Sequence, residues 1–207
     1  MPAMAADWTS ALNRARDHAP FLARVLERRP DLARMLAEGA GEEALLAAKQ
    51  VAEADVATAL RRERLGLALV LAVGDLAGAF DLEKVMRELS TFADRALHAA
   101  LAAAIRKRVP DAEPAGMIGL ALGKHGAGEL NYSSDIDPIL LYEPEQLPRR
   151  ERDEPGEAAQ RYARETVRLL SDVTSEGYVF RVDLRLRPAA EVSPLAISLD
   201  SAITHYE

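Results

Sequence analysis

The stretch from Gly119 to Tyr142, GLALGKHGAGELNYSSDIDPILLY, constrains the fold and chemistry of this chain more than any other. Its pattern predicts an apolar strand, a turn broken by glycines, and a second strand with Asp135 and Asp137 near its start. Residues two apart on a strand project from the same face. Two carboxylates that face one way ionise together at low cost only when a cation lies between them. Taken alone, the segment is equally typical of a turn rich in serine and aspartate.

A third acidic position lies in the segment from Arg181 to Pro188, RVDLRLRP. The alternation of apolar and charged residues from Tyr178 to Leu186 predicts a strand whose charged face carries Asp183 and whose apolar face packs on helices. Three carboxylates on neighbouring strands, next to a glycine turn, suit a magnesium-dependent nucleotide site. The turn itself matches neither the P-loop nor the dinucleotide-binding pattern, so the argument depends on the carboxylates.

The composition excludes several classes of function. Among 207 residues, 49% are hydrophobic and 29% are charged, as in ordinary globular proteins. The net charge of −7 argues against broad binding to nucleic acid or to an anionic membrane. The absence of cysteine excludes disulfides, zinc–thiolate sites and thiol catalysis. The longest apolar run, Leu65 to Val73, is too short to span a bilayer and no signal peptide is visible, so a cytoplasmic location is expected.

The first half of the chain is typical of packed helices. Asp7 and Asp81 are predicted to cap helices, and Pro20 and Pro30 suit first-turn positions. A helical stripe of apolar residues extends from Glu42 to Leu60. These stripes are explained by core packing and need no cofactor.

The clearest break in the pattern lies at Val109 to Pro114, where helical periodicity gives way to strands. We therefore predict a helical N-terminal region over residues 1–110 and a second domain over residues 111–207. Within the second domain, Glu143 to Gly156 is predicted to be a surface loop. A helix is expected from Glu157 to Glu176, ended by Gly177.

Two motifs carry a resemblance to a known family. They are G-K-x-G-x-x-E-L-N-x-S-S-D-I-D, which contains Asp135 and Asp137, and G-Y-V-F-R-V-D-L-R-L-R-P, which contains Asp183. Together they resemble glutamine synthetase adenylyltransferase, a bifunctional enzyme of the nucleotidyltransferase superfamily that is similar to DNA polymerase β. The strong similarity covers Gly116 to Leu195. It implies an α+β fold, with an N-terminal helical bundle followed by a nucleotidyltransferase palm with a mixed β-sheet.

The resemblance also implies roles for particular residues. Three aspartates would be catalytic and would hold one or two magnesium ions, or manganese: Asp135, Asp137 and Asp183. A second group would bind nucleotide or phosphate: Gly123, Lys124, Ser134, Arg185 and Arg187. For Lys124 and the arginines, a surface salt bridge is an alternative to a ligand contact.

The sequences of both motifs resemble the N-terminal, adenylyl-removing half of the family's enzymes more than the C-terminal half. In that half, phosphate attacks an adenylylated tyrosine of glutamine synthetase and releases ADP; in the other half, the tyrosine attacks ATP. The implied partners are glutamine synthetase, ATP or ADP, phosphate, and a PII-type nitrogen-signalling protein that binds through regions outside this chain. A uridylyltransferase that modifies a nitrogen-signalling protein is the nearest rival enzyme. A truncated module that docks on a partner without catalysis is the alternative from another class.

Three further expectations concern details of the chain. Pro138 follows Asp137 where the family has an aliphatic residue, so a local perturbation of the strand ladder is expected. His125, in the glycine turn, is interpreted as incidental. The family pattern continues beyond Glu207, so the chain resembles a fragment with exposed apolar residues near its end: Leu195, Ile197, Leu199 and Ile203.

Overall fold

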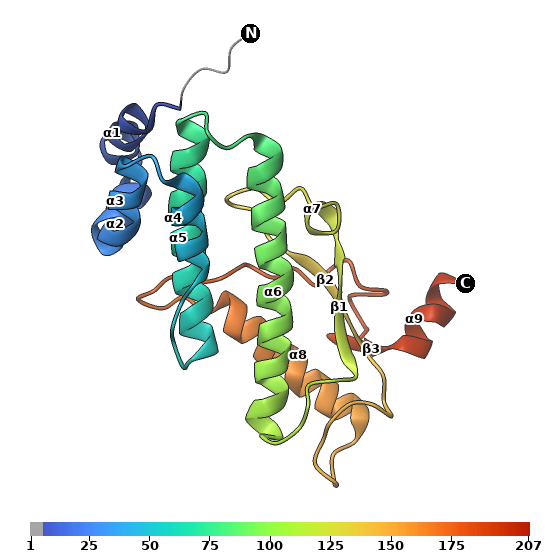
Figure 1. The fold of residues 1–207 in the computed structure, drawn as a ribbon. Coiled ribbons are helices and arrows are strands. Elements are labelled where there is room, and N and C mark those ends of the chain that lie inside the picture. Colours follow the sequence, from blue (N-terminus) through green and yellow to red (C-terminus); the bar gives the residue numbers. More distant parts are fainter. Residues whose placement is uncertain (1–5) are drawn as a thin grey trace. The chain divides into compact units, whose positions relative to one another are not determined.

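The computed structural model describes residues 6–207, which form helices and one small sheet (Figure 1). This α+β composition confirms the predicted fold class. The chain forms two compact units that divide inside helix α6 (Leu82–Arg108), between Leu89 and Ser90. The change from helices to strands comes later, at strand β1 (Met117–Leu122). No helix in the described part of the chain is long and apolar enough to cross a membrane.

In its described residues, the first unit contains helices and no strand. Its elements before α6 are α1 (Trp8–His18), α2 (Pro20–Arg28), α3 (Pro30–Ala37), α4 (Gly41–Lys49) and α5 (Val56–Leu76). The predicted caps are confirmed, because the Asp7 and Asp81 carboxylates accept hydrogen bonds from the Ser10 and Lys84 backbone N–H groups. Pro20 and Pro30 occupy first-turn positions as predicted.

The helix predicted from Glu42 to Leu60 is wrong, because the chain leaves helical geometry after Lys49 and enters α5 only at Val56. Asp55 explains the restart. Its carboxylate accepts hydrogen bonds from both the backbone N–H and the hydroxyl of Thr58. An N-cap of this kind satisfies N–H groups that a new helix leaves unpaired, so it competes with a continuous helix.

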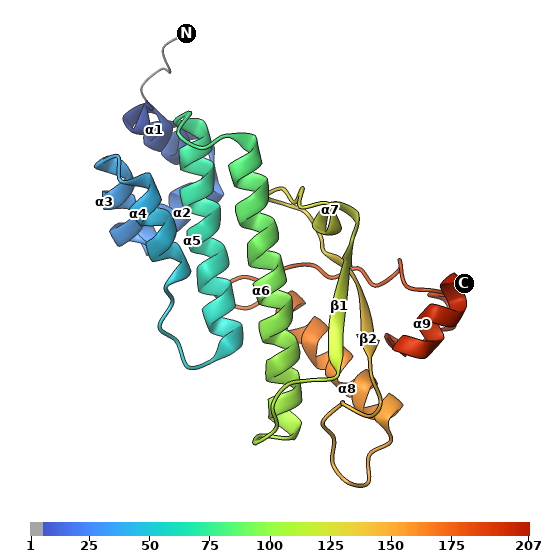
Figure 2. The same ribbon diagram turned by 45° about the vertical axis from the view of Figure 1, so that its right-hand side comes forward.

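The second unit contains a three-stranded mixed sheet in the order β1–β2–β3, where β2 is Asp137–Tyr142 and β3 is Ala196–Ser198. Strands β1 and β2 are antiparallel and lie side by side in Figure 2, whereas β2 and β3 are parallel. The register pairs Pro138 with Ala121 without a bulge, so the perturbation expected at Pro138 is absent. Strand β3 pairs with β2 only from Leu140 onwards, which leaves β1 as the one strand partner of Pro138.

The two faces of the sheet pack differently. On one face, Gly119 lies against Leu97 of α6, and a Cβ at Gly119 would come within 2.5 Å of that side chain. On the other face, α9 (Leu199–Tyr206) covers a small apolar cluster: Ile139, Leu141, Ile197 and Ala202. Ile197 is therefore buried, contrary to expectation.

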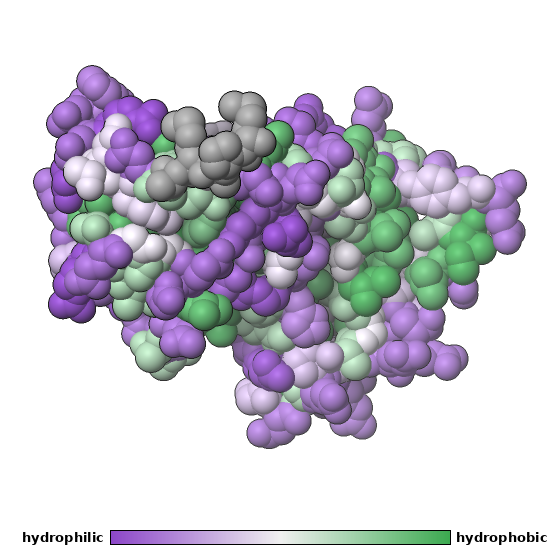
Figure 3. Space-filling view, turned by 45° about the horizontal axis from the view of Figure 1, so that its top comes forward, coloured by the Kyte–Doolittle hydropathy of each residue, from purple (hydrophilic) through white to green (hydrophobic). Residues whose placement is uncertain are grey.

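Exposed apolar residues gather at the right of Figure 3, the side on which Figure 1 draws the sheet and α9. Exposed residues of these elements include Ile118, Leu120 and Ile203.

The segment predicted as a strand from Tyr178 to Leu186 is not a strand. It makes a single parallel bridge, between Val182 and Ile136. The predicted alternation fails because Val179 and Phe180 are both buried, and the backbone N–H groups of both donate to the Leu170 carbonyl oxygen. That carbonyl lies in the last turn of α8 (Pro155–Ser171), so the helix ends before the predicted Gly177.

The loop predicted from Glu143 to Gly156 is held to the helices by charged and apolar anchors. Leu147 is buried, and the Asp153 carboxylate lies between Arg108 of α6 and Arg161 of α8. The hydrogen bond from Arg108 is the main cause that lowers the pKa of Asp153. Lys107 and Arg108, at the end of α6, therefore pair with acidic residues of the same unit.

Glu165 forms the second link between α6 and α8. Its carboxylate accepts hydrogen bonds from Arg168 (2.6 Å) and Lys107 (2.9 Å), and the bond from Arg168 is the main cause that lowers its pKa to about 2. A carboxyl group whose pKa is lower in the folded state stabilises the fold at pH values above its unfolded pKa. The contribution is lost as the pH falls from about 4.5 towards about 2.

We expect Glu165→Gln to lower the free energy of unfolding at pH 7 by about 1 kcal/mol, since both cations are more than half exposed and solvent screens them. The difference from wild type should shrink below about pH 4.5. Urea unfolding at several pH values measures it. Glu157→Gln is the control, because that exposed carboxylate lies 3.5 Å from its only ion-pair partner among the described residues, Arg161. Equal, pH-independent losses in both variants would contradict the prediction.

Candidate active site

The predicted acidic residues are brought together by the bridge between Ile136 and Val182. The Ile136 N–H donates to the Arg181 carbonyl oxygen (3.0 Å), and the Asp183 N–H donates to the Ile136 carbonyl oxygen (2.9 Å). Ile136 is completely buried. Because side chains alternate along an extended backbone, its neighbours Asp135 and Asp137 face the opposite side. Asp183 and Arg181, which flank Val182, share that side, and together they form a charged face.

The glycine turn borders this face. Helix α7 (Gly123–Gly126) is a single turn between the end of β1 and the loop that leads to β2 (Figure 1). Gly123 has a φ of +55°, and a Cβ added there would lie 2.8 Å from Asp137 Oδ2. Only a residue without a side chain allows this approach at this backbone geometry. Lys124 follows on the exposed side of the turn.

The three carboxylates differ in their electrostatic environment. Burial is the main cause that raises the pKa of Asp137, and the negative charges of Asp183 and Asp135 add to it. Asp135 accepts a hydrogen bond from Arg181 Nε at 2.5 Å. Asp183 accepts from Arg185 Nε at 2.8 and 2.9 Å, and this contact is the main cause that lowers the pKa of Asp183. Among the described residues, no arginine or lysine lies within ion-pair distance of Asp137.

These residues suit a divalent cation by their chemistry but not by their present arrangement. Carboxylate oxygens are the preferred ligands of magnesium. The bridge between Ile136 and Val182 puts the three aspartates on one face, and the charges of Asp183 and Asp135 help to raise the pKa of Asp137. Within residues 6–207, however, no three acidic or histidine side chains are positioned to enclose a metal ion. Two of the carboxylates are directed at Arg181 and Arg185 instead. A cation at this face would therefore have to displace both arginines.

Two of the predicted phosphate-binding residues have other contacts. The Ser134 hydroxyl donates to Asn131 Oδ1 (3.0 Å) and accepts from the Asn131 N–H, so it closes the turn before Asp135. The Arg187 guanidinium donates to four backbone carbonyl oxygens of its own loop: Leu184, Ala190, Ser193 and Pro194. Arg187 therefore organises the loop and does not join the charged face. Arg181, which the sequence did not single out, lies there instead.

His125 has a structural role in the glycine turn and is not incidental. Its side chain is 1% exposed, and Nε2 lies 2.9 Å from Oδ1 of Asp94, an exposed residue of α6. This contact links α7 to α6 two residues after Gly123. The positive charge that His125 carries when protonated would lower the pKa of Asp137. A lone histidine in a glycine turn gives no sequence signal for such a contact, because Asp94 lies in another element.

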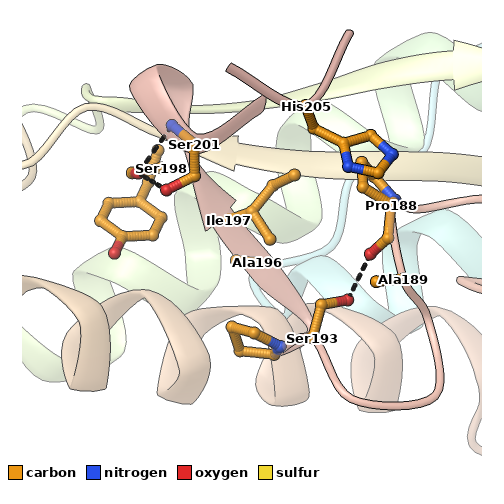
Figure 4. Close-up of a pocket in the computed structure, with 10 residues that line it drawn as sticks. Pro188, Ala189, Ser193, Ala196, Ile197, Ser198, Ser201 and His205 are labelled. Carbon is orange, nitrogen blue, oxygen red and sulfur yellow. Dashed lines mark hydrogen bonds between the residues drawn. The ribbon is translucent and has the colours of Figure 1, made fainter. Parts of the chain in front are cut away.

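A separate pocket of about 290 Å³ lies between β3, α9 and the loop of residues 188–194 that follows Arg187 (Figure 4). None of the predicted site residues lines it. Its serine hydroxyls are used locally: Ser193 donates to the Pro188 carbonyl oxygen, and Ser198 donates to Ser201 Oγ. The remaining wall is mostly apolar, so the charged face is the stronger candidate for chemistry.

The fold and the charged face define an α+β protein in which three aspartates and a glycine turn meet beside a small mixed sheet. The model of the glutamate–ammonia ligase adenylyltransferase family matches residues 9–207, and the chain belongs to that family. It is 44% identical, over 91% of its length, to the bifunctional glutamine synthetase adenylyltransferase/adenylyl-removing enzyme of Caulobacter vibrioides. It is 42% identical, over 90% of its length, to the enzyme of the same name from Xanthobacter autotrophicus. The chain spans about a fifth of the length of these relatives.

Proposed function

We propose that this chain carries an adenylyl-transfer site that acts on a tyrosine of glutamine synthetase in the cytoplasm, in the phosphate-dependent, adenylyl-removing direction. An oxygen of inorganic phosphate attacks the phosphorus of the adenylyl group, the bond to the tyrosine oxygen breaks, tyrosine recovers a proton, and ADP leaves. The observation that carries the proposal is the gathering of Asp135, Asp137 and Asp183 beside Gly123. It is supported by membership of the family along residues 9–207.

Asp135, Asp137 and Asp183 are the proposed ligands of magnesium, or of manganese. When bound, such a cation neutralises the phosphate oxygens and orients them for in-line displacement. The rotation needed to free the carboxylates is small in cost, because the Arg181 and Arg185 side chains are 59% and 85% exposed. Asp137 needs no such exchange, which makes it the proposed central ligand.

The other side chains at this face would bind and orient the anionic reactants. Gly123 is proposed to offer its backbone N–H to a phosphate, because it has no side chain to obstruct the approach. Lys124 supplies a point charge from the exposed side of the turn, and the guanidinium groups of Arg181 and Arg185 offer planar pairs of donors. Positioning of this kind supplies most of the rate in phosphoryl-type transfer. A PII-type signalling protein and ATP remain proposed partners.

The test is to incubate the chain with adenylylated glutamine synthetase, phosphate and magnesium, and to measure ADP. Two parallel reactions supply ATP with unmodified glutamine synthetase, and UTP with a PII-type protein. ADP formation that requires phosphate supports the proposal. Pyrophosphate release from ATP or UTP would show that the direction or the substrate is wrong. Binding of glutamine synthetase without turnover in any reaction would identify a docking module and overturn the proposal.

A further inference from the structure

The two arginines at the charged face share features that set them apart from Arg187. Arg181 holds Asp135 and also donates to the Ser133 carbonyl oxygen at 2.9 Å. Arg185 holds Asp183 through both Nε and Nη2. Both side chains are largely exposed, so each contact can exchange with a solute.

We propose that Arg181 and Arg185 are exchangeable counter-ions that couple cation binding to phosphate binding. Without ligands they neutralise Asp135 and Asp183; when a divalent cation takes these carboxylates, the released guanidinium groups bind phosphate oxygens. This inference rests on the proposed function, because it concerns the same site. It accounts for three carboxylates on one face of which two are paired with arginine.

The charges of this face predict that cation binding and phosphate binding favour each other. Two guanidinium groups offset most of the charge of three carboxylates. A cation that arrives alone meets two positive groups that must be displaced, and an anion that arrives alone meets the carboxylates. When both arrive together, each takes the partner that the other has released. Arginine suits this exchange because one guanidinium forms paired hydrogen bonds with either a carboxylate or a phosphate.

Asp137 supports the same interpretation. It has no ion-pair partner among the described residues, and it lies close enough to both paired aspartates for their charges to act on it. The cation therefore has one available ligand at which to bind first. Arg187 cannot take part, since four carbonyl oxygens of its loop already hold its guanidinium.

The experiment is calorimetric titration of the wild-type chain with magnesium, with and without inorganic phosphate, at known free-magnesium concentrations. Phosphate is expected to increase the magnesium affinity by about 5-fold or more, the usual range of coupling between two sites. By reciprocity, magnesium should increase the phosphate affinity by the same factor. An affinity that phosphate leaves unchanged would overturn the inference.

The variants Arg181→Ala and Arg185→Ala test the role of the arginines more directly than the wild-type titration does. Each is expected to bind magnesium more tightly than wild type in the absence of phosphate, because a competing counter-ion is gone, and to lose most of the coupling. General damage to the fold would weaken binding instead. Arg164→Ala is the matched control, since it removes the same charge from an exposed position of α8. It should keep the wild-type coupling.

Weaker magnesium binding in both site variants, or equal changes in Arg164→Ala, would overturn the inference. So would a wild-type chain that binds no magnesium at millimolar concentration. The turnover assay is independent of these results. Coupling without ADP formation would support this inference and refute the proposed reaction. ADP formation without coupling would support the proposed reaction and refute this inference.

Discussion

Replacing Asp137 by asparagine is expected to reduce ADP formation by about 10³-fold, as the loss of one group that stabilises charge in the transition state commonly does. Asp137 is the carboxylate that lies against Gly123 and that has no arginine partner among the described residues. Asparagine keeps the shape of the side chain and removes only its charge. The remaining two carboxylates would stay paired with arginine, and the face would lose its first ligand for a cation.

The same substitution should leave the fold intact or stabilise it slightly at neutral pH. Burial and two negative neighbours raise the pKa of Asp137, so its ionised form opposes folding above that pKa. Asparagine removes this penalty. Turnover and thermal unfolding are measured on the same preparations, with Asp111→Asn as the control at an exposed loop position. Equal turnover in the two variants would exclude Asp137 from the chemistry.

The sequence predicted the elements whose signals are local. The caps at Asp7 and Asp81 and the first-turn prolines depend on neighbours within one helical turn, and all are confirmed. Strand β1 lies where the pattern placed it, and β2 begins at Asp137, so Asp135 lies just before the strand that was predicted to carry it. Their apolar residues continue on both sides of a turn, so each strand finds its partner nearby in the chain.

The same reasoning failed where contacts with another element decide the conformation. The alternation from Tyr178 to Leu186 is typical of a strand, but Val179 and Phe180 are both drawn into the core beside the end of α8. The predicted strand makes only one bridge, between Val182 and Ile136. That bridge is nevertheless sufficient to place Asp183 on the face of Asp135 and Asp137.

The partners of charged side chains were the least predictable part of the candidate site. Arg181, Arg185 and Arg187 occupy alternate positions, and a regular strand would have directed all three to one face. The turn after Asp183 breaks that pattern, so Arg187 binds the carbonyls of its loop while Arg181 reaches Asp135. The contact of His125 with Asp94 likewise depends on how α7 lies on α6, which no local pattern encodes.

Gly123→Ala is expected to lower turnover by about 10²-fold, the cost of displacing a reacting group by about 1 Å. The new methyl group would come within 2.8 Å of Asp137 Oδ2, closer than carbon and oxygen approach without a shift. Either the carboxylate rotates away or α7 moves off the sheet. Both movements change the distance between the glycine turn and Asp137. The contact between His125 and Asp94 links α7 to α6 and so opposes the second movement.

Gly128→Ala separates this effect from backbone strain. Gly128 has a φ of +74°, so alanine is strained there as at Gly123, but a Cβ at Gly128 would have nothing within 4 Å. Both variants should lose about 1–2 kcal/mol of stability from the left-handed backbone. Only Gly123→Ala should also lose turnover and magnesium affinity. If the two variants lose the same turnover in proportion to their stability, the turn supports the fold alone, and the close approach of Gly123 to Asp137 has no part in the chemistry.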